Sequence, residues 1–337
     1  MSVMEDRAGA LCIATWGGGI NRVKDHQVST ISITNGLTHD KALSLLESRD
    51  GSLWVGMDFD GGLNRLGDTA RNSFPRQEGL FSGPIRAIHE DATGDLWVGT
   101  GRGLNIYRQG KFTGFTTAKG LAGNNVTAIH EDATGRIWLG TDGGLSRWEK
   151  GKFVNYTTSQ GLSHNSVNAI YETADHTLWI GTKGGGLNRF KDEKFTAYTT
   201  KQGLFSDEVY EVIEDELGFF WMSCRKGIFR VKKSDFDDLD RKTIELVTSI
   251  VFGKADGLFS VQCNGVAKPS AWKARDGRIW FPTIRGAVAV EPRIKFNDKP
   301  PPVFIEEIIA DQQPLPWSAE SMSNAPHLIP NSRTGTR

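Results

Sequence analysis

A short phrase centred on tryptophan recurs along the chain at a nearly constant interval. Successive copies are separated by steps of 43, 41, 41 and 42 residues. Weaker copies at 11–15 and 279–283 bring the number of repeats to seven. A period slightly above 40 residues, with short apolar runs between glycine-rich turns, predicts a β-propeller whose blades have four strands. The five clear copies surround Trp54, Trp97, Trp138, Trp179 and Trp221.

One repeat, residues 126–162, shows how a blade is built. Its β-rich runs predict strands at 126–130, 137–141, 145–148 and 153–157, and each is followed by a glycine-containing turn or loop. We therefore expect an all-β fold, a seven-bladed β-propeller of four-stranded antiparallel blades. The best short helix candidate is 234–242, with Ser234 or Asp235 as its cap.

Two recurring features look functional but are better explained by structure. Stacked blades must fill the space between their faces, so the repeated tryptophans are expected to be core residues. The repeated Glu-Asp pairs resemble paired catalytic carboxylates. However, an active site needs one constellation and not one per blade, so these pairs are expected to form turns. They occur at 90–91, 131–132 and 214–215.

Composition excludes several functions. The 40 basic residues are balanced by 40 acidic ones, and no long basic run occurs, which argues against nucleic-acid binding. No apolar run is long enough to cross a membrane. The seven histidines lack metal-ligand spacing, so neither a metal nor a cofactor is expected. Cys12, Cys224 and Cys263 are too few and too scattered for a disulfide framework or a zinc site, and Cys12 occupies a tryptophan position as a small core residue.

The repeat pattern breaks near both ends. We expect the propeller to span 1–299 with an insertion at 234–265, because the step from Trp221 to Trp280 is longer than the others. A proline cluster at 300–302 then predicts a connector, 300–337, into a further β domain that the chain does not contain. Residues 3–6 align with the second half of an inner strand, so the first blade is expected to begin incomplete. Whether the ring closes is left open.

The repeats resemble the two-component regulator propeller family, the sensor regions of one-piece and hybrid histidine kinases. The resemblance rests on repeats such as 178–189, and on a closing run from 255–258 through 280–283 to 300–307. It implies an extracytoplasmic (periplasmic) sensor that binds oligosaccharides. A β-sandwich, a membrane helix and a cytoplasmic kinase would follow in a longer parent, which could be dimeric. This chain has no kinase or other catalytic motif, so we expect it not to be an enzyme.

Propeller topology predicts where a ligand would bind. Strands alternate in direction within a blade, so the loops after second strands and the loops crossing between blades share one face, near the channel mouth. The candidate residues are those that vary between matched loops. After second strands they are Trp16, Asp58, Phe59, Asp60, Arg102, Asp142, Lys183, Arg225, Lys226 and Arg285. In crossing loops they are His39, Asp40, Lys41, Asn124, Asn125, His164, Asn165, Asp207, Glu208, Gln262 and Asn264.

These side chains suit a small, polar, hydroxylated ligand such as an oligosaccharide. Replacing Trp16 or Arg102 by alanine is expected to weaken its binding. Phe81, Phe205 and Phe259 occupy matched positions in Gly-Leu-Phe-Ser copies and are expected to pack in the core. Two alternatives stay open. A protein-binding scaffold could use the same rim, and a propeller lyase or hydrolase could draw two carboxylates from among Asp58, Asp60, Asp142, Asp207 and Glu208.

Overall fold

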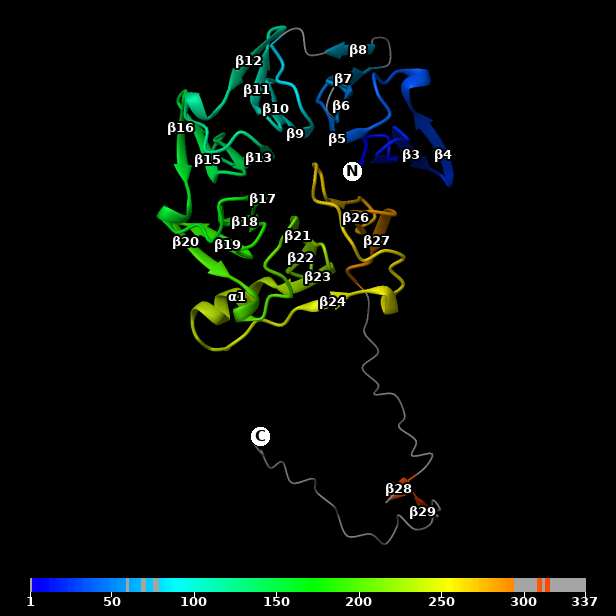
Figure 1. Cartoon of the computed structure of the whole chain (residues 1–337), viewed down its shortest axis with the longest axis vertical. Helices are drawn as coiled ribbons and strands as arrows, with labels where there is room; N and C mark the ends of the chain where they lie inside the picture. The colour runs from blue at the N-terminus through cyan, green and yellow to red at the C-terminus, as the bar shows by residue number, and fades with distance from the viewer. Residues whose placement is uncertain are drawn as a thin grey trace. The chain divides into compact units, whose positions relative to one another are not determined.

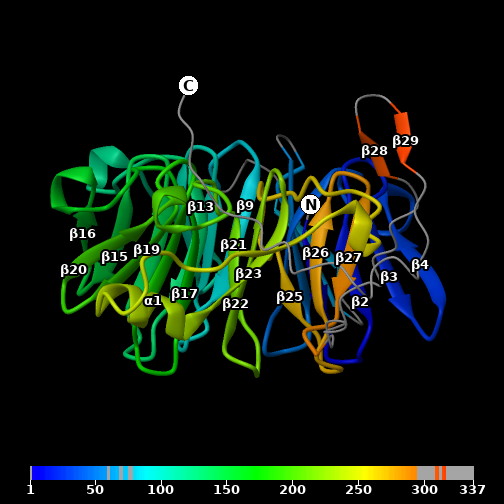
Figure 2. The same ribbon diagram turned by 90° about the horizontal axis from the view of Figure 1, so that it is seen from below.

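The computed structural model describes residues 2–58, 61–67, 71–74, 79–293, 308–310 and 313–315. The chain forms two units, Met1–Pro292 and Arg293–Arg337. In the first unit, seven antiparallel sheets surround a common centre, so the predicted seven-bladed β-propeller is confirmed (Figure 1). Within each blade the strands follow chain order from the centre outward, and Figure 2 shows the ring edge-on, with strands running between its two faces.

The first four blades each contain four strands. Blade one comprises β1 (Val3–Glu5), β2 (Leu11–Ala14), β3 (Ile20–Lys24) and β4 (Gln27–Ile31). Blade two comprises β5 (Ala42–Glu47), β6 (Leu53–Met57), β7 (Leu63–Leu66) and β8 (Arg71–Phe74). Blade three comprises β9 (Ile85–Glu90), β10 (Leu96–Thr100), β11 (Gly103–Arg108) and β12 (Lys111–Phe115). Blade four comprises β13 (Val126–Glu131), β14 (Ile137–Thr141), β15 (Leu145–Glu149) and β16 (Lys152–Tyr156), within one residue of the prediction.

The last three blades are less uniform. Blade five comprises β17 (Val167–Glu172), β18 (Leu178–Thr182), β19 (Leu187–Lys191) and β20 (Lys194–Tyr198). Blade six comprises β21 (Glu211–Glu214), β22 (Phe219–Cys224), β23 (Gly227–Lys232) and β24 (Ile250–Phe252), with α1 (Lys233–Asp240) inserted before its outer strand. Blade seven has three strands in the part of the chain described, β25 (Trp272–Lys273), β26 (Ile279–Thr283) and β27 (Gly286–Val290). Single-turn 3-10 helices occupy the crossing loops at Ile33–Asn35, Thr117–Lys119, Thr158–Gln160, Thr200–Gln202 and Lys254–Asp256.

The predicted helix exists, but its predicted cap is wrong. β23 runs directly into α1, the N-cap is Lys232, and no side chain caps the helix. The first helical N–H, of Lys233, instead donates to the carbonyl of Gly218 at 2.8 Å, which replaces one side-chain cap. On the inner side of the helix, Phe236 is fully buried against the rings of Trp179 and Tyr198. The insertion therefore covers the join between blades five and six.

The repeated tryptophans are core residues, as expected. All five are at most 5% exposed, and Cys12, in the equivalent position, is 1% exposed. The aspartate of each Glu-Asp pair fixes the indole ring of the following tryptophan by accepting a hydrogen bond from it. Asp132 accepts a hydrogen bond from Trp138 Nε1 at 2.8 Å, while also accepting the backbone N–H of Arg136 across the turn. The same Trp-to-Asp bond recurs in blades three and six.

The Glu of two of these pairs, Glu90 and Glu131, joins neighbouring blades. Glu131, at the end of β13, accepts the backbone N–H of Ala92 in the preceding blade's turn at 3.0 Å. The same contact closes the ring, because Glu5 of β1 accepts the N–H of Arg275 from blade seven at 2.7 Å. Val3 N–H also donates to the Pro269 carbonyl at 3.1 Å. Thus β1 is short, at three residues, but it forms a complete blade and a closed ring.

In the second unit, β28 (Ile308–Ala310) and β29 (Gln313–Leu315) pair as an antiparallel hairpin. Across the described ranges, no helix is both long and apolar enough to span a bilayer.

Candidate functional site at the channel mouth

The two faces of the ring differ in what they present. On one, here called the loop face, the loops after second strands pair with the crossing loops, as Lys183 N–H does with the Ser166 carbonyl at 2.9 Å. On the other, here called the turn face, tight turns join first to second strands and are linked by the glutamates described above. The shared face predicted for the two loop sets is therefore confirmed.

A channel-crossing loop, residues 262–270, spans the centre of the ring ahead of β25, and its tip reaches the middle of the view (Figure 1). Its Lys268 connects distant blades. The N–H of Lys268 donates to the Arg86 carbonyl in blade three at 2.7 Å, and its carbonyl accepts the N–H of Leu45 in blade two at 3.2 Å. Its Nζ lies 2.9 Å from Glu211 Oε2 in blade six. These contacts hold the loop across the channel.

On the loop-face side of this loop lies the mouth cavity, with a volume of about 350 Å³. Most of its wall consists of side chains that can donate or accept hydrogen bonds. Inner strands of blades three, four and five contribute one residue each, and the channel-crossing loop and the loops flanking strands of blades four to seven supply the rest of the wall. The lining residues are Arg86, Asn125, Thr127, Ser166, Asn168, Lys183, Glu208, Tyr210, Gln262, Cys263, Asn264, Gly265, Val266 and Ile284.

A β-bulge in successive inner strands aims the polar side chains of this wall. The register of β9, β13 and β17 skips one residue, which is Arg86, Thr127 and Asn168 respectively. A bulge redirects the side chain of the extra residue. Thr127 Oγ1 and Asn168 Nδ2 then donate to carbonyls of the next blade, at 2.5 and 3.2 Å. Arg86 differs, because its Nη1 reaches the Val266 carbonyl across the channel at 3.1 Å.

Burial shapes the electrostatics of the mouth cavity. Desolvation lowers the pKa of Arg86, although the carboxylates of Asp58 and Asp142 oppose the shift; an arginine nevertheless stays cationic. Burial also raises the pKa of Tyr210, and the Glu208 carboxylate adds to the effect. Two buried atoms, Arg86 Nε and Asn125 Oδ1, have no hydrogen-bond partner among the described residues. Such groups are costly to leave unpaired, which favours a polar ligand.

The structure brings five of the predicted residues together at the mouth cavity. Lys183 and Glu208 come from the loop face of blades five and six, and Asn125 comes from the loop entering β13. Asn264 Oδ1 accepts the N–H of Val266 at 3.0 Å and so also shapes the channel-crossing loop. Gln262 completes the group.

Six other predicted residues hold the crossing loops themselves. Asp207 Oδ1 accepts the N–H of Thr200, seven residues earlier, at 2.7 Å, and this bond caps a 3-10 turn. Asp40, Asn124 and Asn165 make the same bond in their own loops. His39 and His164 each accept, through Nδ1, the N–H two residues later. These side chains have a structural task at matched positions.

The remaining described candidates lie on the loop face but outside the cavity wall. Trp16 is 54% exposed, with Lys41 Nζ 5.4 Å from its ring centroid. Asp58 is buried. Arg102, Asp142, Arg225, Lys226 and Arg285 are exposed. Phe59 and Asp60 lie outside the described residues.

The packing prediction for one phenylalanine is wrong. Phe205 packs against Phe229, with ring centroids 5.5 Å apart, and Phe81 is partly buried, as expected. Phe259 is instead 71% exposed, and its ring lies 4.5 Å from the Arg285 guanidinium. In β27, Val288 aligns with Phe229 and offers less surface for an aromatic ring to cover.

Sequence reasoning missed three inner-strand members of the mouth cavity, Arg86, Thr127 and Asn168, and also Tyr210, which directly precedes β21. A signal was present, because they recur at repeat spacing and are polar or amphipathic where their neighbours are apolar. The orientation of Arg86, Thr127 and Asn168 depends on the bulge, and a sequence pattern with a period of two assigns such residues to the wrong side of the strand.

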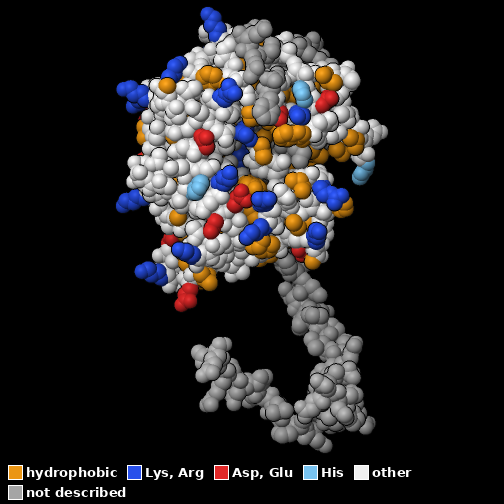
Figure 3. Space-filling view, viewed as in Figure 1, with side chains coloured by type: hydrophobic (Ala, Val, Ile, Leu, Met, Phe, Trp, Pro, Cys, Tyr) orange, Lys and Arg blue, Asp and Glu red, His pale blue; other side chains and the backbone are white. Residues whose placement is uncertain are grey.

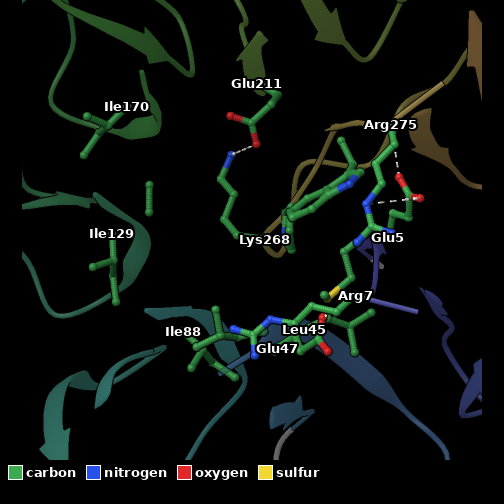
Figure 4. A pocket seen from close by; sticks show the side chains of 15 residues that line it. Glu5, Arg7, Leu45, Glu47, Ile88, Ile129, Ile170, Glu211, Lys268 and Arg275 are labelled. Carbon is green, nitrogen blue, oxygen red and sulfur yellow. Dashed lines mark hydrogen bonds and ion pairs between the residues drawn. The ribbon is translucent and has the colours of Figure 1, made fainter. Parts of the chain in front are cut away.

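A second cavity, of about 440 Å³, opens on the turn-face side of the channel-crossing loop (Figure 4). Its wall is largely aliphatic, with Ile88, Ile129 and Ile170 at matched positions of successive blades. The charged groups there are engaged with one another: Lys268 points to Glu211, and Arg275 lies beside Glu5. This cavity suits a polar ligand less well than the mouth cavity does. No cluster of three metal-ligating side chains occurs in the ranges that the structure describes.

Comparison with known proteins agrees with the repeats. Residues 79–102, 120–143 and 161–184 match the family model described as Two component regulator propeller, which confirms the resemblance predicted from the sequence. Among curated proteins, none matches the sequence.

Solved structures show the same fold. The extracellular domain of a B. thetaiotaomicron protein described as a hybrid two component system, BT3049, is 23% identical with a TM-score of 0.78, covering 94% of this chain and 44% of that one. Catalytically inactive virginiamycin B lyase from Staphylococcus aureus is 14% identical, with a TM-score of 0.64 and coverages of 86% and 92%. PorZ, a surface component of the type-IX secretion system of Porphyromonas gingivalis, is 13% identical, with a TM-score of 0.63 and coverages of 86% and 46%. This chain thus spans less than half of the BT3049 domain.

Proposed function

Because three of its repeats match the two-component regulator propeller model, we propose that this chain is the ligand-sensing propeller of a two-component signal transduction system. The ligand is a carbohydrate or another polar, hydroxylated molecule that enters the mouth cavity. The observation that carries this proposal is the cavity wall, where polar side chains from four blades and the channel-crossing loop converge. A concave site with a few convergent polar groups is typical of small-molecule recognition.

The likeness to a lyase raises an enzymatic alternative. Hydrolysis of a glycosidic bond needs two carboxyl groups that flank the scissile bond. Of the described residues lining the mouth cavity, Glu208 alone carries a carboxyl group. Asp207, the adjacent carboxylate, is committed to the N–H of Thr200. These observations favour binding over catalysis.

The protein-scaffold alternative would use the exposed apolar side chains of the loop face. Phe259 and Ile284 are 71% and 52% exposed, so an apolar patch is present. It borders the mouth cavity through Ile284. A scaffold would not, however, require the buried polar groups at the centre of the ring.

In the proposed system the propeller lies outside the cytoplasm and belongs to a longer sensor. Residues 300–337 would lead into a following β-sandwich, and a histidine kinase module elsewhere would give the output. Ligand binding would change how the propeller engages that module. The kinase activity belongs to the parent or a partner and not to these blades.

The test is a thermal-shift screen of the whole chain against neutral oligosaccharides, followed by titration calorimetry of each hit. A ligand that binds the folded state raises the melting temperature by mass action. Gln262→Ala and Lys183→Ala change cavity-lining side chains and are expected to weaken binding about tenfold, the loss of about one hydrogen bond to a ligand. Lys194→Ala, on outer strand β20, is the matched control. Trp16→Ala and Arg102→Ala change residues of the loop face outside the cavity wall, and they are expected to weaken ligand binding less than the two cavity variants do. Hits unaffected by both cavity variants would contradict the proposal.

A further inference from the structure

The basic side chains of the two faces differ in their partners. On the turn face most are paired with acids, for example Arg136 with Asp132 at 2.7 Å and Arg22 with Asp6 at 2.6 Å. On the loop face, among the described residues, no carboxylate lies within ion-pair distance of Arg86, Arg102, Lys183 or Arg225. In the view along the ring axis, basic side chains lie near the centre of the ring, with acidic side chains among them (Figure 3). The described part of the loop face therefore presents cations that no carboxylate of that part contacts directly.

Three acids of the loop face, Asp207, Asp40 and Asp142, are engaged by backbone N–H groups. Asp207 and Asp40 cap backbone N–H groups, at 2.7 Å each. Asp142 accepts the N–H of Asn125 at 3.1 Å. The loops of this face thus engage these three carboxylates through backbone N–H groups and not through basic side chains.

Arg86 is the central member of this set. It lines the mouth cavity, its Nη1 is bound to the Val266 carbonyl, and its buried Nε has no partner. A neutral carbonyl satisfies one donor but does not balance a buried positive charge. At the positions matched to Arg86, Thr127 and Asn168 join blades with short neutral side chains. The join between blades therefore does not require an arginine.

We infer that Arg86, with Lys183 of blade five in the wall of the same cavity, forms an anion subsite in the mouth cavity that binds an acidic oxygen group, a carboxylate or sulfate, carried by a hydroxylated ligand. The inference rests on the proposed function and narrows it from polar ligands in general to acidic ones. Binding would bring a negative charge to a desolvated guanidinium, where charge-assisted hydrogen bonds are strong. The neutral donors and acceptors of Asn125, Ser166 and Gln262 would contact the hydroxyl groups of the same ligand.

The experiment uses the full chain and three probes: glucuronate, its neutral counterpart glucose, and inorganic sulfate, each titrated by calorimetry at constant ionic strength. The expected result is measurable binding of glucuronate, weaker binding of sulfate, and no binding of glucose at the same concentrations. Arg86→Gln and Lys183→Gln should each weaken glucuronate binding by about 10- to 100-fold, the range expected for a lost hydrogen bond to a charged group. Arg86→Lys, which keeps the charge, should retain part of the affinity.

Because Arg86 also holds the channel-crossing loop, Arg86→Gln needs a check that the loop stays in place. Protection of the Lys268 amide from hydrogen exchange provides it. Lys183→Gln needs no such check, since the exposed side chain of Lys183 makes no hydrogen bond in the described structure.

Equal binding of glucose and glucuronate, binding of sulfate without glucuronate, or glucuronate binding that survives both substitutions would overturn the inference. Its failure can be told from failure of the proposed function. Suppose that a neutral oligosaccharide binds less tightly to Gln262→Ala and that neither glucuronate nor sulfate binds the native protein. That result would reject the anion subsite but would still support the mouth cavity as a sensor site. If no cavity variant changes the affinity of any bound ligand, both the anion subsite and the proposed function are rejected.

Discussion

Arg86 Nη1 donates a hydrogen bond to the carbonyl of Val266, 3.1 Å away and 180 residues later in the chain. The pair joins the inner strand of blade three to a loop from blade seven, across the centre of the ring. One guanidinium thus lines the mouth cavity and also holds the loop that forms its floor. A ligand that binds Arg86 would act directly on that loop, which contacts the inner strands of four blades.

The channel-crossing loop depends on close approach at one glycine. A Cβ on Gly265 would lie 2.6 Å from the Cβ of Tyr210, inside any real contact distance. Gly265→Ala should therefore displace the loop and lower the free energy of unfolding by about 1–3 kcal/mol, the usual cost of overpacking. Urea unfolding and ligand titration measure the two effects. Gly253→Ala is the matched control, because a Cβ there meets nothing within 4 Å. Equal stability of the two variants would mean that the loop does not lie against Tyr210.

Ring closure depends on Glu5. Its carboxylate accepts the N–H of Arg275 at 2.7 Å, joining the first and last blades. Glu5→Ala should lower the free energy of unfolding by about 1–3 kcal/mol, as expected for a lost charge-assisted hydrogen bond. Hydrogen exchange should speed up in β1 and β25 before other strands. Glu245→Ala, at an exposed residue, serves as control. A Glu5 variant as stable as this control would show that the ring does not close through this contact.

The turn aspartates predict acid sensitivity. Burial alone would raise the pKa of Asp132, but hydrogen bonds from Thr134, Trp138 and Arg136 outweigh it and hold that pKa below its usual value. A carboxyl with a depressed folded-state pKa contributes stability that is present above its unfolded pKa of about 3.9 and is lost as pH falls through the folded value. Asp132→Asn should thus cost about 1–3 kcal/mol at pH 7.

The measurement is urea unfolding at a series of pH values. The difference between the native protein and Asp132→Asn should shrink steadily below about pH 4. Asp192→Asn, at an exposed turn residue, should differ little at any pH. A difference that stays constant with pH would show that the Asp132 carboxylate is not ionised in the folded state.

All three cysteines are buried free thiols. Burial raises the pKa of Cys263 to about 12, with a smaller contribution from Cys224, and burial raises that of Cys12 to about 12, with Asp6 adding. Because the thiolate is the reactive form, the native protein should resist iodoacetamide at pH 8 and react at all three sites in denaturant. Mass spectrometry counts the adducts, and Lys152→Cys on exposed β16 supplies a reactive reference. Rapid native labelling of Cys263 would indicate that the channel-crossing loop opens.

The fold was predictable because its determinants are local and repeated. The tryptophan of the second strand recurs in five blades, and Gly-Thr after it or an Asp six residues before it accompanies it in most of them, which is enough to specify the strand and its turn. The first-strand alignment of residues 3–6 was also informative, since β1 is the shortened strand that it implied. Ring closure was not predictable, because the bond from Arg275 to Glu5 joins residues 270 positions apart.

The candidate site was predictable only in part. Topology correctly placed two loop sets on one face, and five predicted residues line the mouth cavity. Arg86 was missed because a bulge sets its direction, and Asp207 was selected although it caps a turn. Variation between repeats identifies where a sequence is free to change. It does not distinguish side chains that contact a cavity from those that hold a loop.

The central claim is that ligand binds in the mouth cavity on the loop face, and hydrogen–deuterium exchange of the full chain tests it most directly. The probe is whichever oligosaccharide or acidic sugar gives the largest thermal shift. The account predicts slower exchange in peptides covering 124–127, 166–168, 208–210 and 262–266, with no change at 45–47 or 272–275. Protection confined to 45–47 and 272–275 would place the ligand in the turn-face cavity and contradict the account.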